Sequence, residues 1–443
     1  MATGSGSSAA TIFALSSGLP PSGVAVVRVS GPKTRFGLET LIDSVPEPRR
    51  AILASIRSSD EVIDLGLVLF FPSPASFTGE DVAEFHVHGG RAVVDALLTA
   101  LAALPGFRPA EAGEFTRRAF LNRKLDLTQA EALADLVRAE TEMQRREALR
   151  HAGGEARELY EGWRERIVRA RALIEAELDF PDEADVPGSV SEEALGDVLT
   201  IADEIAAHLD DGGRGERLRD GAEIVILGAP NAGKSTLLNA LARRDVAIVA
   251  PESGTTRDLI EVRLDLGGYP VTLVDTAGLR DAPGTVEREG VRRALGRAGG
   301  ADMVLWLEDM AGAPGDPPAA LASAVLRVGT KADLVESGAE QSRYDAVISA
   351  STGQGLDRLV EAIAGHIRDR LAPREALSVA RARHRAALTA ARAALLAGLA
   401  PGQPLELRAE EFRAASDHLG RITGRVDAEN LLDVIFREFC IGK

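Results

Sequence analysis

Residues 228–235 read Gly228-Ala-Pro-Asn-Ala-Gly-Lys-Ser235, which satisfies the pattern Gly-x-x-x-x-Gly-Lys-[Ser/Thr]. An apolar run at 224–227 precedes this stretch, and a run typical of a helix follows at 236–241. In a strand–loop–helix unit the glycines let backbone N–H groups face phosphates, and the helix N-terminus favours negative charge. Lys234 is then expected to reach the β- and γ-phosphates of a nucleotide, and Ser235 to bind Mg²⁺. We therefore predict a phosphate-binding loop rather than a chance glycine-rich turn.

Two further motifs carry groups suited to a metal ion and a γ-phosphate. Gly254-Thr-Thr-Arg-Asp258 follows the loop, and a threonine in such a segment can bind Mg²⁺ and sense the γ-phosphate. Asp275-Thr-Ala-Gly278 closes an apolar run, so its carboxylate is expected beside Mg²⁺ and the Gly278 N–H at the γ-phosphate. We predict Ser235 and Thr256 as the Mg²⁺ ligands.

Base recognition is assigned to Thr330-Lys-Ala-Asp333 and Ser349-Ala-Ser351. The Asp333 carboxylate can accept two hydrogen bonds from N1 and N2 of guanine, which adenine cannot donate, so GTP is preferred over ATP. The first motif usually begins with asparagine, which ties the base loop to the phosphate loop. Thr330 is shorter, and we expect weaker guanine affinity. The residues predicted to contact GTP are Asn231, Ala232, Gly233, Lys234, Ser235, Thr236, Ala250, Thr255, Thr256, Asp275, Thr276, Ala277, Gly278, Thr330, Lys331, Asp333, Ser349, Ala350 and Ser351.

Residues 1–122 have the pattern of a mixed α/β domain. Short runs rich in β-branched residues at 24–29, 65–71 and 82–88 predict strands. A run at 92–104 predicts a helix.

The rest of the chain alternates between two kinds of sequence composition. Residues 123–218 and 372–443 are rich in Ala, Glu, Arg and Leu, with the apolar spacing of long helices. Residues 219–371 contain short apolar runs flanked by helices, which predicts a parallel sheet. The simplest arrangement inserts this unit into a discontinuous helical domain, so the predicted fold class is α/β and all-α multidomain. The predicted strands are 224–227, 271–274, 303–307, 325–328 and 346–348.

Composition limits the possible functions. The chain has 443 residues, a net charge of −16 and one cysteine, Cys440. The acidic balance argues against a chain that coats nucleic acid by itself. A single cysteine rules out a disulfide framework within the chain and fits a reducing cytoplasm. The sequence shows no signal peptide and no membrane span of ~20 apolar residues, and its last four residues fit a prenylation box poorly.

With these motifs in place, the chain closely resembles the MnmE (TrmE) family of tRNA-modification GTPases. The resemblance runs from end to end and includes the phosphate loop and the segment 254–258. The other segments that match the family are residues 23–31, Ser76-Phe-Thr-Gly-Glu-Asp81, His88-Gly-Gly90, Gly113-Glu-Phe-Thr-Arg-Arg-Ala-Phe120, Asn122, Lys124-Leu-Asp-Leu-Thr-Gln-Ala-Glu131 and Phe439-Cys-Ile-Gly-Lys443.

The resemblance implies an N-terminal folate-binding domain that forms a homodimer, and a Ras-like P-loop GTPase domain inserted in the helical domain. It implies a partner, MnmG (GidA), that holds FAD, and tRNA as the substrate. The two proteins would install an aminomethyl or carboxymethylaminomethyl group at carbon 5 of the wobble uridine. The one-carbon unit would come from 5-formyl- or methylene-tetrahydrofolate.

The resemblance also assigns site residues. Arg28, Glu84, Lys124 and Lys443 match the folate contacts, and Cys440 is placed near them with a possible catalytic role. Asn231 matches a K⁺ ligand, with Ala250, Glu252 and Thr255 completing that site, so hydrolysis would be stimulated by K⁺ and gated by dimerisation of the GTPase domain. Glu287 matches the residue that orients the attacking water. From the residues alone, a surface ion pair is the commoner fate of Arg28, Glu84 and Lys124.

Two alternatives remain at this stage. A regulatory GTPase of ribosome assembly would share the nucleotide motifs, but would carry an RNA-binding module that the flanking segments do not show. Alternatively, the N-terminal domain alone is the catalyst, a folate-dependent aminomethyl transferase, and GTP acts only as a switch.

Overall fold

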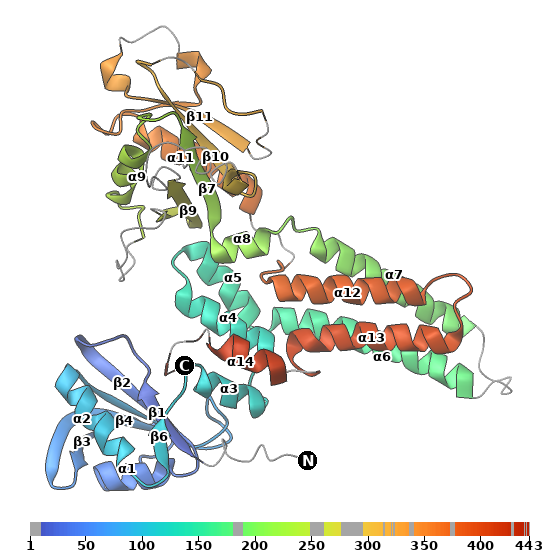
Figure 1. The fold of residues 1–443 in the computed structure, drawn as a ribbon. Coiled ribbons are helices and arrows are strands. Elements are labelled where there is room, and N and C mark those ends of the chain that lie inside the picture. Colours follow the sequence, from blue (N-terminus) through green and yellow to red (C-terminus); the bar gives the residue numbers. More distant parts are fainter. Residues whose placement is uncertain are drawn as a thin grey trace, which may run out of the picture. The chain divides into compact units, whose positions relative to one another are not determined.

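A computed structural model of the chain describes residues 10–179, 189–248, 261–275, 296–312, 315–319, 321, 324–335, 341–372, 377–426, 429–437, 439 and 441–442. The chain divides into two compact units (Figure 1). The first comprises Met1–Ala134, His151–Glu165 and Asp417–Lys443, and the second comprises Asp135–Arg150 and Arg166–Ser416.

The first unit contains a six-stranded sheet in the order β3-β4-β5-β2-β1-β6. Its paired strands are antiparallel except β1 and β6. The predicted strands at 24–29, 65–71 and 82–88 are confirmed within β2, β4 and β5, and the predicted helix is α2. The elements are β1 (Thr11–Leu15), β2 (Ser22–Ser30), α1 (Thr34–Ile42), β3 (Ile52–Ser58), β4 (Glu61–Phe71), β5 (Val82–Gly89), α2 (Arg91–Ala102) and β6 (Phe107–Pro109).

The two faces of this sheet differ in burial because side chains alternate along each strand. On β2, Val27 and its inward neighbours are buried in one core with Leu38 of α1 and Leu97 of α2. The intervening residues, such as Arg28, lie on the opposite face and are only partly buried. An antiparallel sheet covered by helices on one side leaves its other face available for contacts.

Helices lie on both sides of the inserted domain in sequence. Before it come α3 (Glu114–Leu121), α4 (Leu127–Arg138), α5 (Glu142–Ala152), α6 (Glu155–Asp179), α7 (Ser189–Leu209) and α8 (Arg214–Asp220). After it come α12 (Ala382–Gly398), α13 (Leu405–Thr423) and α14 (Glu429–Arg437).

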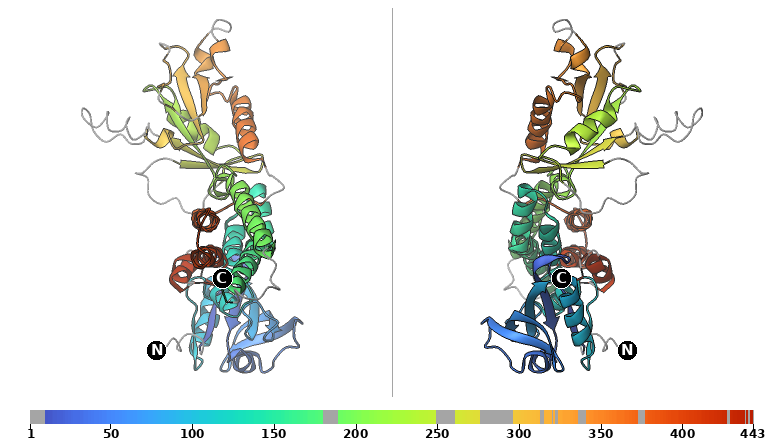
Figure 2. Two further views of the ribbon diagram at one scale, coloured as in Figure 1. Left: turned by 90° about the vertical axis from the view of Figure 1, so that its right-hand side faces the viewer. Right: turned by 90° about the vertical axis from the view of Figure 1, so that its left-hand side faces the viewer.

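The helices before and after the inserted domain pack together. Helix α12 lies along α7, and Arg392 donates to the carbonyl of Ala202 at 3.2 Å (Figures 1 and 2). Gly398 of α12 also lies against the ring of Phe412 of α13. The predicted discontinuous helical domain with an inserted α/β unit is therefore confirmed.

The inserted unit is a second six-stranded sheet in the order β12-β11-β10-β7-β9-β8. All neighbours are parallel except β8 and β9, which is the expected arrangement of a Ras-like P-loop domain. Its elements are β7 (Ala222–Gly228), α9 (Lys234–Ala242), β8 (Glu261–Leu266), β9 (Tyr269–Asp275), β10 (Met303–Asp309), β11 (Ala324–Thr330), η2 (Ala332–Leu334), η3 (Gln341–Arg343), β12 (Ala346–Val347) and α11 (Leu356–Leu371).

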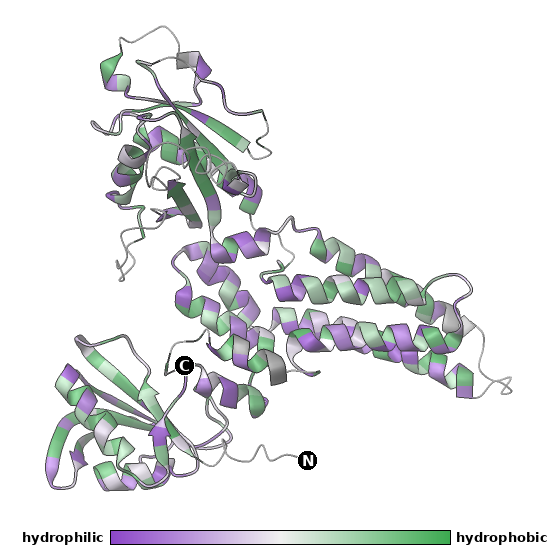
Figure 3. Ribbon diagram, in the orientation of Figure 1, coloured by the Kyte–Doolittle hydropathy of each residue, from purple (hydrophilic) through white to green (hydrophobic). Residues whose placement is uncertain are grey.

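Strand β7 reads as a continuous apolar run because both faces of this sheet are covered. Ile224 and Ile226 are buried in a core shared with α9 and α11, whereas Val225 is buried in a second core on the opposite face. Figure 3 shows the central strands among the most hydrophobic segments. The carboxyl ends of parallel strands meet at one edge, which is where ligands bind in such sheets.

Candidate functional site

The phosphate-loop motif forms the predicted connection between β7 and α9. Gly228 has φ +149°, and a Cβ there would lie 2.3 Å from the Leu307 carbonyl oxygen of β10. Gly233 caps α9 in the left-handed region with φ +91°. Asn231 also has a positive φ of 62°. The loop therefore has a tight backbone, and such a loop before a helix can present its N–H groups to a phosphate.

The Lys234 ammonium lies over this loop. Its Nζ donates to the carbonyl oxygens of Gly228 and Ala229, each at 2.9 Å. Carbonyls are neutral acceptors, so a phosphate entering the loop offers this cation stronger, charged hydrogen bonds. Lys234 is thus held within the loop in which it is predicted to act.

Ser235 and Asp275 form the second part of the site. The Ser235 hydroxyl donates to Asp275 Oδ2 at 2.7 Å, and Asp275 is wholly buried at the end of β9. Mg²⁺ prefers oxygen ligands and is usually held by few protein groups beside the phosphates. A hydroxyl and a buried carboxylate in contact are suited to this ion.

Thr330 connects the base loop with the phosphate loop. Its hydroxyl lies 2.8 Å from the Ala232 carbonyl oxygen and 3.1 Å from that of Glu308, and the side chain is buried. A hydroxyl has one proton, so it can donate to only one of these acceptors at a time. The amide of an asparagine has two N–H donors. This difference is a physical reason for the weaker tie expected from the sequence.

We expect Thr330→Val to weaken GDP binding about tenfold, because two buried carbonyls lose a shared donor without a change of shape. We expect Thr330→Asn to strengthen binding relative to the wild type. Fluorescence titration with a labelled GDP measures both changes. Equal affinity in Thr330→Val and the wild type would show that the hydroxyl does not support the site.

The other base-recognition residues gather at the ends of β11 and β12. Asp333 lies exposed in η2, and the Ala332 N–H bonds to the Ile348 carbonyl at 3.1 Å, which joins the two motifs. Ser349 is buried, and its hydroxyl is 3.0 Å from that of Ser351. Ala350 lies between them in the chain.

Lys331 contacts a residue that the sequence did not single out. Its Nζ lies 2.6 Å from Asp309 Oδ2 at the end of β10. This hydrogen bond lowers the pKa of the Asp309 carboxyl, against an opposing effect of burial. The only sequence signal was the position of Asp309 after an apolar run that predicts a strand.

Several predicted site residues lie outside the described residues. From the GTP and cation sites these are Ala250, Glu252, Thr255, Thr256, Thr276, Ala277, Gly278 and Glu287, and from the folate site they are Cys440 and Lys443.

The N-terminal sheet brings Arg28 and Glu84 together. They face each other across β2 and β5, and the guanidinium donates twice to Glu84 Oε1 at 2.9 and 3.0 Å. The second carboxylate oxygen is 3.2 Å from His86 Nε2. Lys124 donates to the Pro74 carbonyl at 3.1 Å instead of joining this pair.

Two motifs from the sequence line this ion pair. The Arg28 guanidinium lies over the rings of Phe77 and Phe115, at 5.7 and 5.8 Å from their centroids. Phe77 belongs to residues 76–81 and Phe115 to residues 113–120. Phe115 is wholly buried, whereas Phe77 is 37% exposed. An exposed ring beside a cation and a carboxylate is suited to a flat heterocycle that carries hydrogen-bond donors and an acidic tail.

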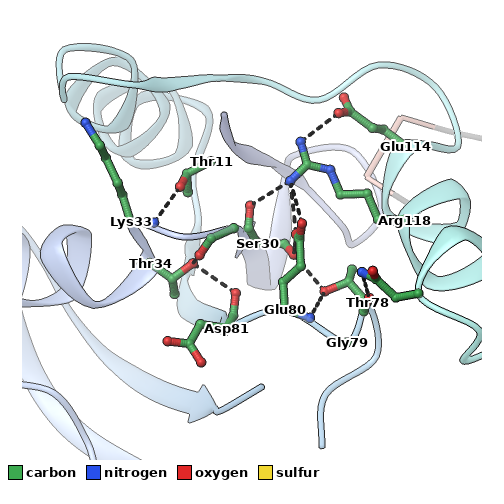
Figure 4. A network of polar contacts seen from close by, with 12 residues as sticks. Thr11, Ser30, Lys33, Thr34, Thr78, Gly79, Glu80, Asp81, Glu114 and Arg118 are labelled. Carbon is green, nitrogen blue, oxygen red and sulfur yellow. Dashed lines mark hydrogen bonds and ion pairs between the residues drawn. The ribbon is translucent and has the colours of Figure 1, made fainter. Parts of the chain in front are cut away.

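Other residues of these two motifs form a polar network with Ser30 of β2 (Figure 4). Arg118 donates to Glu80 at 3.0 Å and to Glu114 at 2.9 Å, and it is 5% exposed. Ser30 donates to Glu80 and lies 2.7 Å from the Thr78 hydroxyl. Because buried charges require such partners, these residues hold the motif segments against β2.

The described C-terminal residues lie on the same domain. Ile441 forms an antiparallel bridge with Ala112, and the Gly442 carbonyl accepts from the Ser16 hydroxyl at 2.8 Å. A Cβ on Gly442 would lie 2.0 Å from the Leu15 carbonyl oxygen, so glycine is required by this close approach.

Comparison with known proteins gives end-to-end matches. Residues 127–440 match the family described as MnmE helical domain, and residues 11–124 match the GTP-binding protein TrmE N-terminus. A tRNA modification GTPase MnmE from Brucella canis is 54% identical over 98% of this chain and 98% of its own length. The protein of the same name from Brucella anthropi is 55% identical over the same shares. Within the described residues, no helix combines the length and apolar character needed to cross a membrane.

Proposed function

The chain belongs to the MnmE family of tRNA modification GTPases, and from this membership we propose that its GTP hydrolysis drives modification of the tRNA wobble uridine in the cytoplasm. The proposed product is 5-carboxymethylaminomethyl- or aminomethyluridine. The proposed partner is MnmG (GidA), which holds FAD, and the one-carbon donor is 5-formyl- or methylene-tetrahydrofolate. The observation that carries the proposal is the assembly of Lys234, the Ser235–Asp275 pair and Thr330 at one sheet edge.

We propose four segments for this function: a folate-binding and dimerising domain at 1–122, helical parts at 123–218 and 372–443, and a GTPase domain at 219–371. In the GTPase domain, Lys234 would neutralise the β- and γ-phosphates, and Ser235 with Thr256 would bind Mg²⁺. Buried Asp275 would orient the Ser235 hydroxyl or bind the ion itself. Glu287 would orient the water that attacks the γ-phosphate.

We further propose a K⁺ site at Asn231, completed by Ala250, Glu252 and Thr255. A cation there would offset the charge that develops during phosphoryl transfer, as an arginine finger does. The place of Asn231 in the phosphate loop supports this assignment, because its amide oxygen is a neutral group that can bind a cation beside the phosphates. Its positive φ of 62° is a conformation that asparagine adopts more readily than most residues.

Steady-state GTP turnover at equal ionic strength in K⁺ and Na⁺ tests the cation site. We expect turnover to be at least about tenfold faster in K⁺, a small part of what an arginine finger contributes. The variant that tests the proposed ligand is Asn231→Gly, because glycine tolerates the positive φ and the substitution removes only the side-chain amide. It should lose the K⁺ stimulation and keep the Na⁺ rate. Equal wild-type rates in the two salts exclude the site.

The open face of the N-terminal sheet supports dimerisation and folate binding at one place. Leu53, Leu65 and Leu67 are 64, 52 and 45% exposed, and Leu67 pairs across the strands with both Leu53 and His86. Contiguous exposed apolar side chains mark contact surfaces. Since β5 carries His86 and Glu84 on that face, a second copy covering the leucines would lie close to the Arg28–Glu84 pair.

In the full-length protein, Leu65→Glu with Leu67→Glu should convert a dimer into a monomer, because burying two carboxylates in an apolar interface is costly. Sedimentation measures the mass. Affinity for 5-formyl-tetrahydrofolate should fall about tenfold or more, as expected when residues central to an interface are lost. Leu407→Glu is the control, since Leu407 is 53% exposed on α13. A variant that stays dimeric contradicts the assignment of the interface.

The alternative function, a regulatory GTPase of ribosome assembly, is separated by a genetic test. Deletion of the gene should remove the wobble-uridine modification, and the wild type should restore it whereas Lys234→Ala should not. Normal modification in the deletion strain, together with a defect in ribosomal subunits, would favour the alternative.

A further inference from the structure

Arg297 lies between two carboxylates, one on the central strand β7 and one on the edge strand β8 of the GTPase sheet. Its guanidinium makes two parallel hydrogen bonds with Glu223 of β7, at 2.9 and 3.0 Å. Its Nη2 also donates to Glu261 of β8 at 3.0 Å. The bonds to Glu223, reinforced by the one to Glu261, raise the pKa of Arg297 against the effect of burial. One side chain therefore joins two strands of the sheet.

The positions of these residues in the sequence indicate what this link between β7 and β8 does. Glu261 directly follows residues 249–260, which carry Thr255 and Thr256, and Arg297 follows residues 276–295, which carry Glu287. Both segments lie outside the described residues. Arg297 thus ties together the points at which the chain returns from the two segments proposed to sense the γ-phosphate.

Hydrogen bonds of Asp302 extend this link from Glu223 toward the helical domain. The Asp302 N–H bonds to the Glu223 carbonyl at 2.9 Å, and Asp302 Oδ2 accepts from the Glu223 N–H at 3.0 Å. The buried Asp302 carboxylate pairs with Arg217 of α8, and its carbonyl accepts from Arg370 of α11 at 2.7 Å. Helices α8 and α11 are where the chain enters and leaves the inserted domain.

An ordinary surface ion pair is the competing explanation, because exposed pairs contribute little. The side chains of Arg297, Glu223 and Glu261 are 31, 34 and 45% exposed. However, one guanidinium here serves two carboxylates, and the bond to Glu223 is bidentate. Removing the cation leaves two like charges beside each other. Strand β9 lies between β7 and β8 and pairs with both, so what depends on Arg297 is the side-chain link between these two strands rather than their pairing in the sheet.

We propose that Arg297 is a positioning residue for GTP hydrolysis, which fixes the returning ends of both nucleotide-sensing segments to β7 and links them through Asp302 to α8 and α11. This inference rests on the proposed function of those segments. It assigns the route by which the nucleotide state reaches the helical domain to the Arg297–Glu223 ion pair, the hydrogen bonds between Glu223 and Asp302, and the contacts of Asp302 with α8 and α11.

Steady-state kinetics of the full-length protein test the positioning role. Arg297→Gln should lower kcat about tenfold and leave KM within about twofold, as for residues that couple sites without touching a ligand. Arg297→Lys should recover part of the loss. The kcat of Arg297→Gln combined with Glu261→Gln should be no lower than that of Arg297→Gln alone, because both changes remove the same interaction. Multiplying effects, or an unchanged kcat in Arg297→Gln, overturn the inference.

The matched control is Arg244→Gln, which breaks a G-domain ion pair with Asp357 through a side chain 29% exposed. It should keep the wild-type kcat, and a comparable loss there would assign the effect to general destabilisation. Hydrogen exchange of α8 provides a second readout. Wild-type exchange should differ between GDP and a non-hydrolysable GTP analogue, and Arg297→Gln should lose that difference while binding both nucleotides. A retained difference, or none in the wild type, overturns the link to α8.

Failure of the proposed function looks different. A wild-type protein that does not hydrolyse GTP removes both the function and the inference. A wild-type protein that hydrolyses GTP, with an Arg297→Gln variant that matches it, removes only the inference.

Discussion

Replacing Lys234 with alanine is expected to lower single-turnover GTP hydrolysis by about 10²–10³-fold, the size of effect seen when one preorganised donor is removed from a developing charge. The ammonium lies on the carbonyls of Gly228 and Ala229, at the N-terminus of α9. An alanine leaves the loop backbone unchanged and removes the only full charge that the loop itself contributes. Phosphate release from enzyme saturated with GTP measures the chemical step separately from binding.

The matched control for this variant is Arg243→Ala. Arg243 is exposed and follows the last turn of the same helix. The substitution therefore removes a cation from α9 at the end away from the phosphate loop. Its turnover should stay within about twofold of the wild type, because exposed charges at that distance are screened. A Lys234→Ala variant that also turns over normally would show that the loop does not hold the reacting phosphates.

The main elements of the GTPase sheet could be predicted because its central strands are buried on both faces. Such strands read as continuous apolar runs, and β7, β9 and β10 contain the runs at 224–227, 271–274 and 303–307. Strand β8 was missed because it is the antiparallel edge strand. Its sequence, Glu-Val-Arg-Leu-Asp-Leu, alternates and buries one face only, so it forms no apolar run.

The contacts within the sites could not be derived from local sequence. Arg28 meets Glu84 because β2 lies beside β5 in a given register, and the residues are 56 positions apart. Thr330 reaches the phosphate loop 98 positions away because its strand ends near the same sheet edge. Residue type suggested that each belongs to a site, but strand order and register decide which groups meet.

The structure also sharpens the expectation about Thr330. The sequence alone suggested that threonine ties the two loops less well than asparagine because it is shorter. The hydroxyl does reach the Ala232 carbonyl, because Gly233 and the loop lie close to β11. The remaining deficit compared with asparagine is the number of protons available for two carbonyls rather than the length of the side chain.

The second large effect is expected from Asp333→Asn. Guanine offers its N1–H and its 2-amino group as donors, and a carboxylate accepts both. An asparagine amide accepts one of them and sets its own N–H₂ against the 2-amino group. GTP affinity should therefore fall by roughly 10²–10⁴-fold, as expected when two paired polar groups each lose about 1–3 kcal/mol.

Xanthine makes this prediction specific, because it keeps the N1–H and has a carbonyl oxygen at position 2. The asparagine amide can accept from N1–H and donate to that oxygen, so Asp333→Asn should bind and hydrolyse XTP with nearly the affinity that the wild type has for GTP. Competition between the two nucleotides measures the exchange of preference.

Asp333 lies exposed in η2, so the substitution should not disturb the core. Asp316→Asn, at a carboxylate 77% exposed in an ion pair with Arg327, should keep the preference for GTP. If Asp333→Asn loses GTP without gaining XTP, the residue supports the loop but does not contact the base.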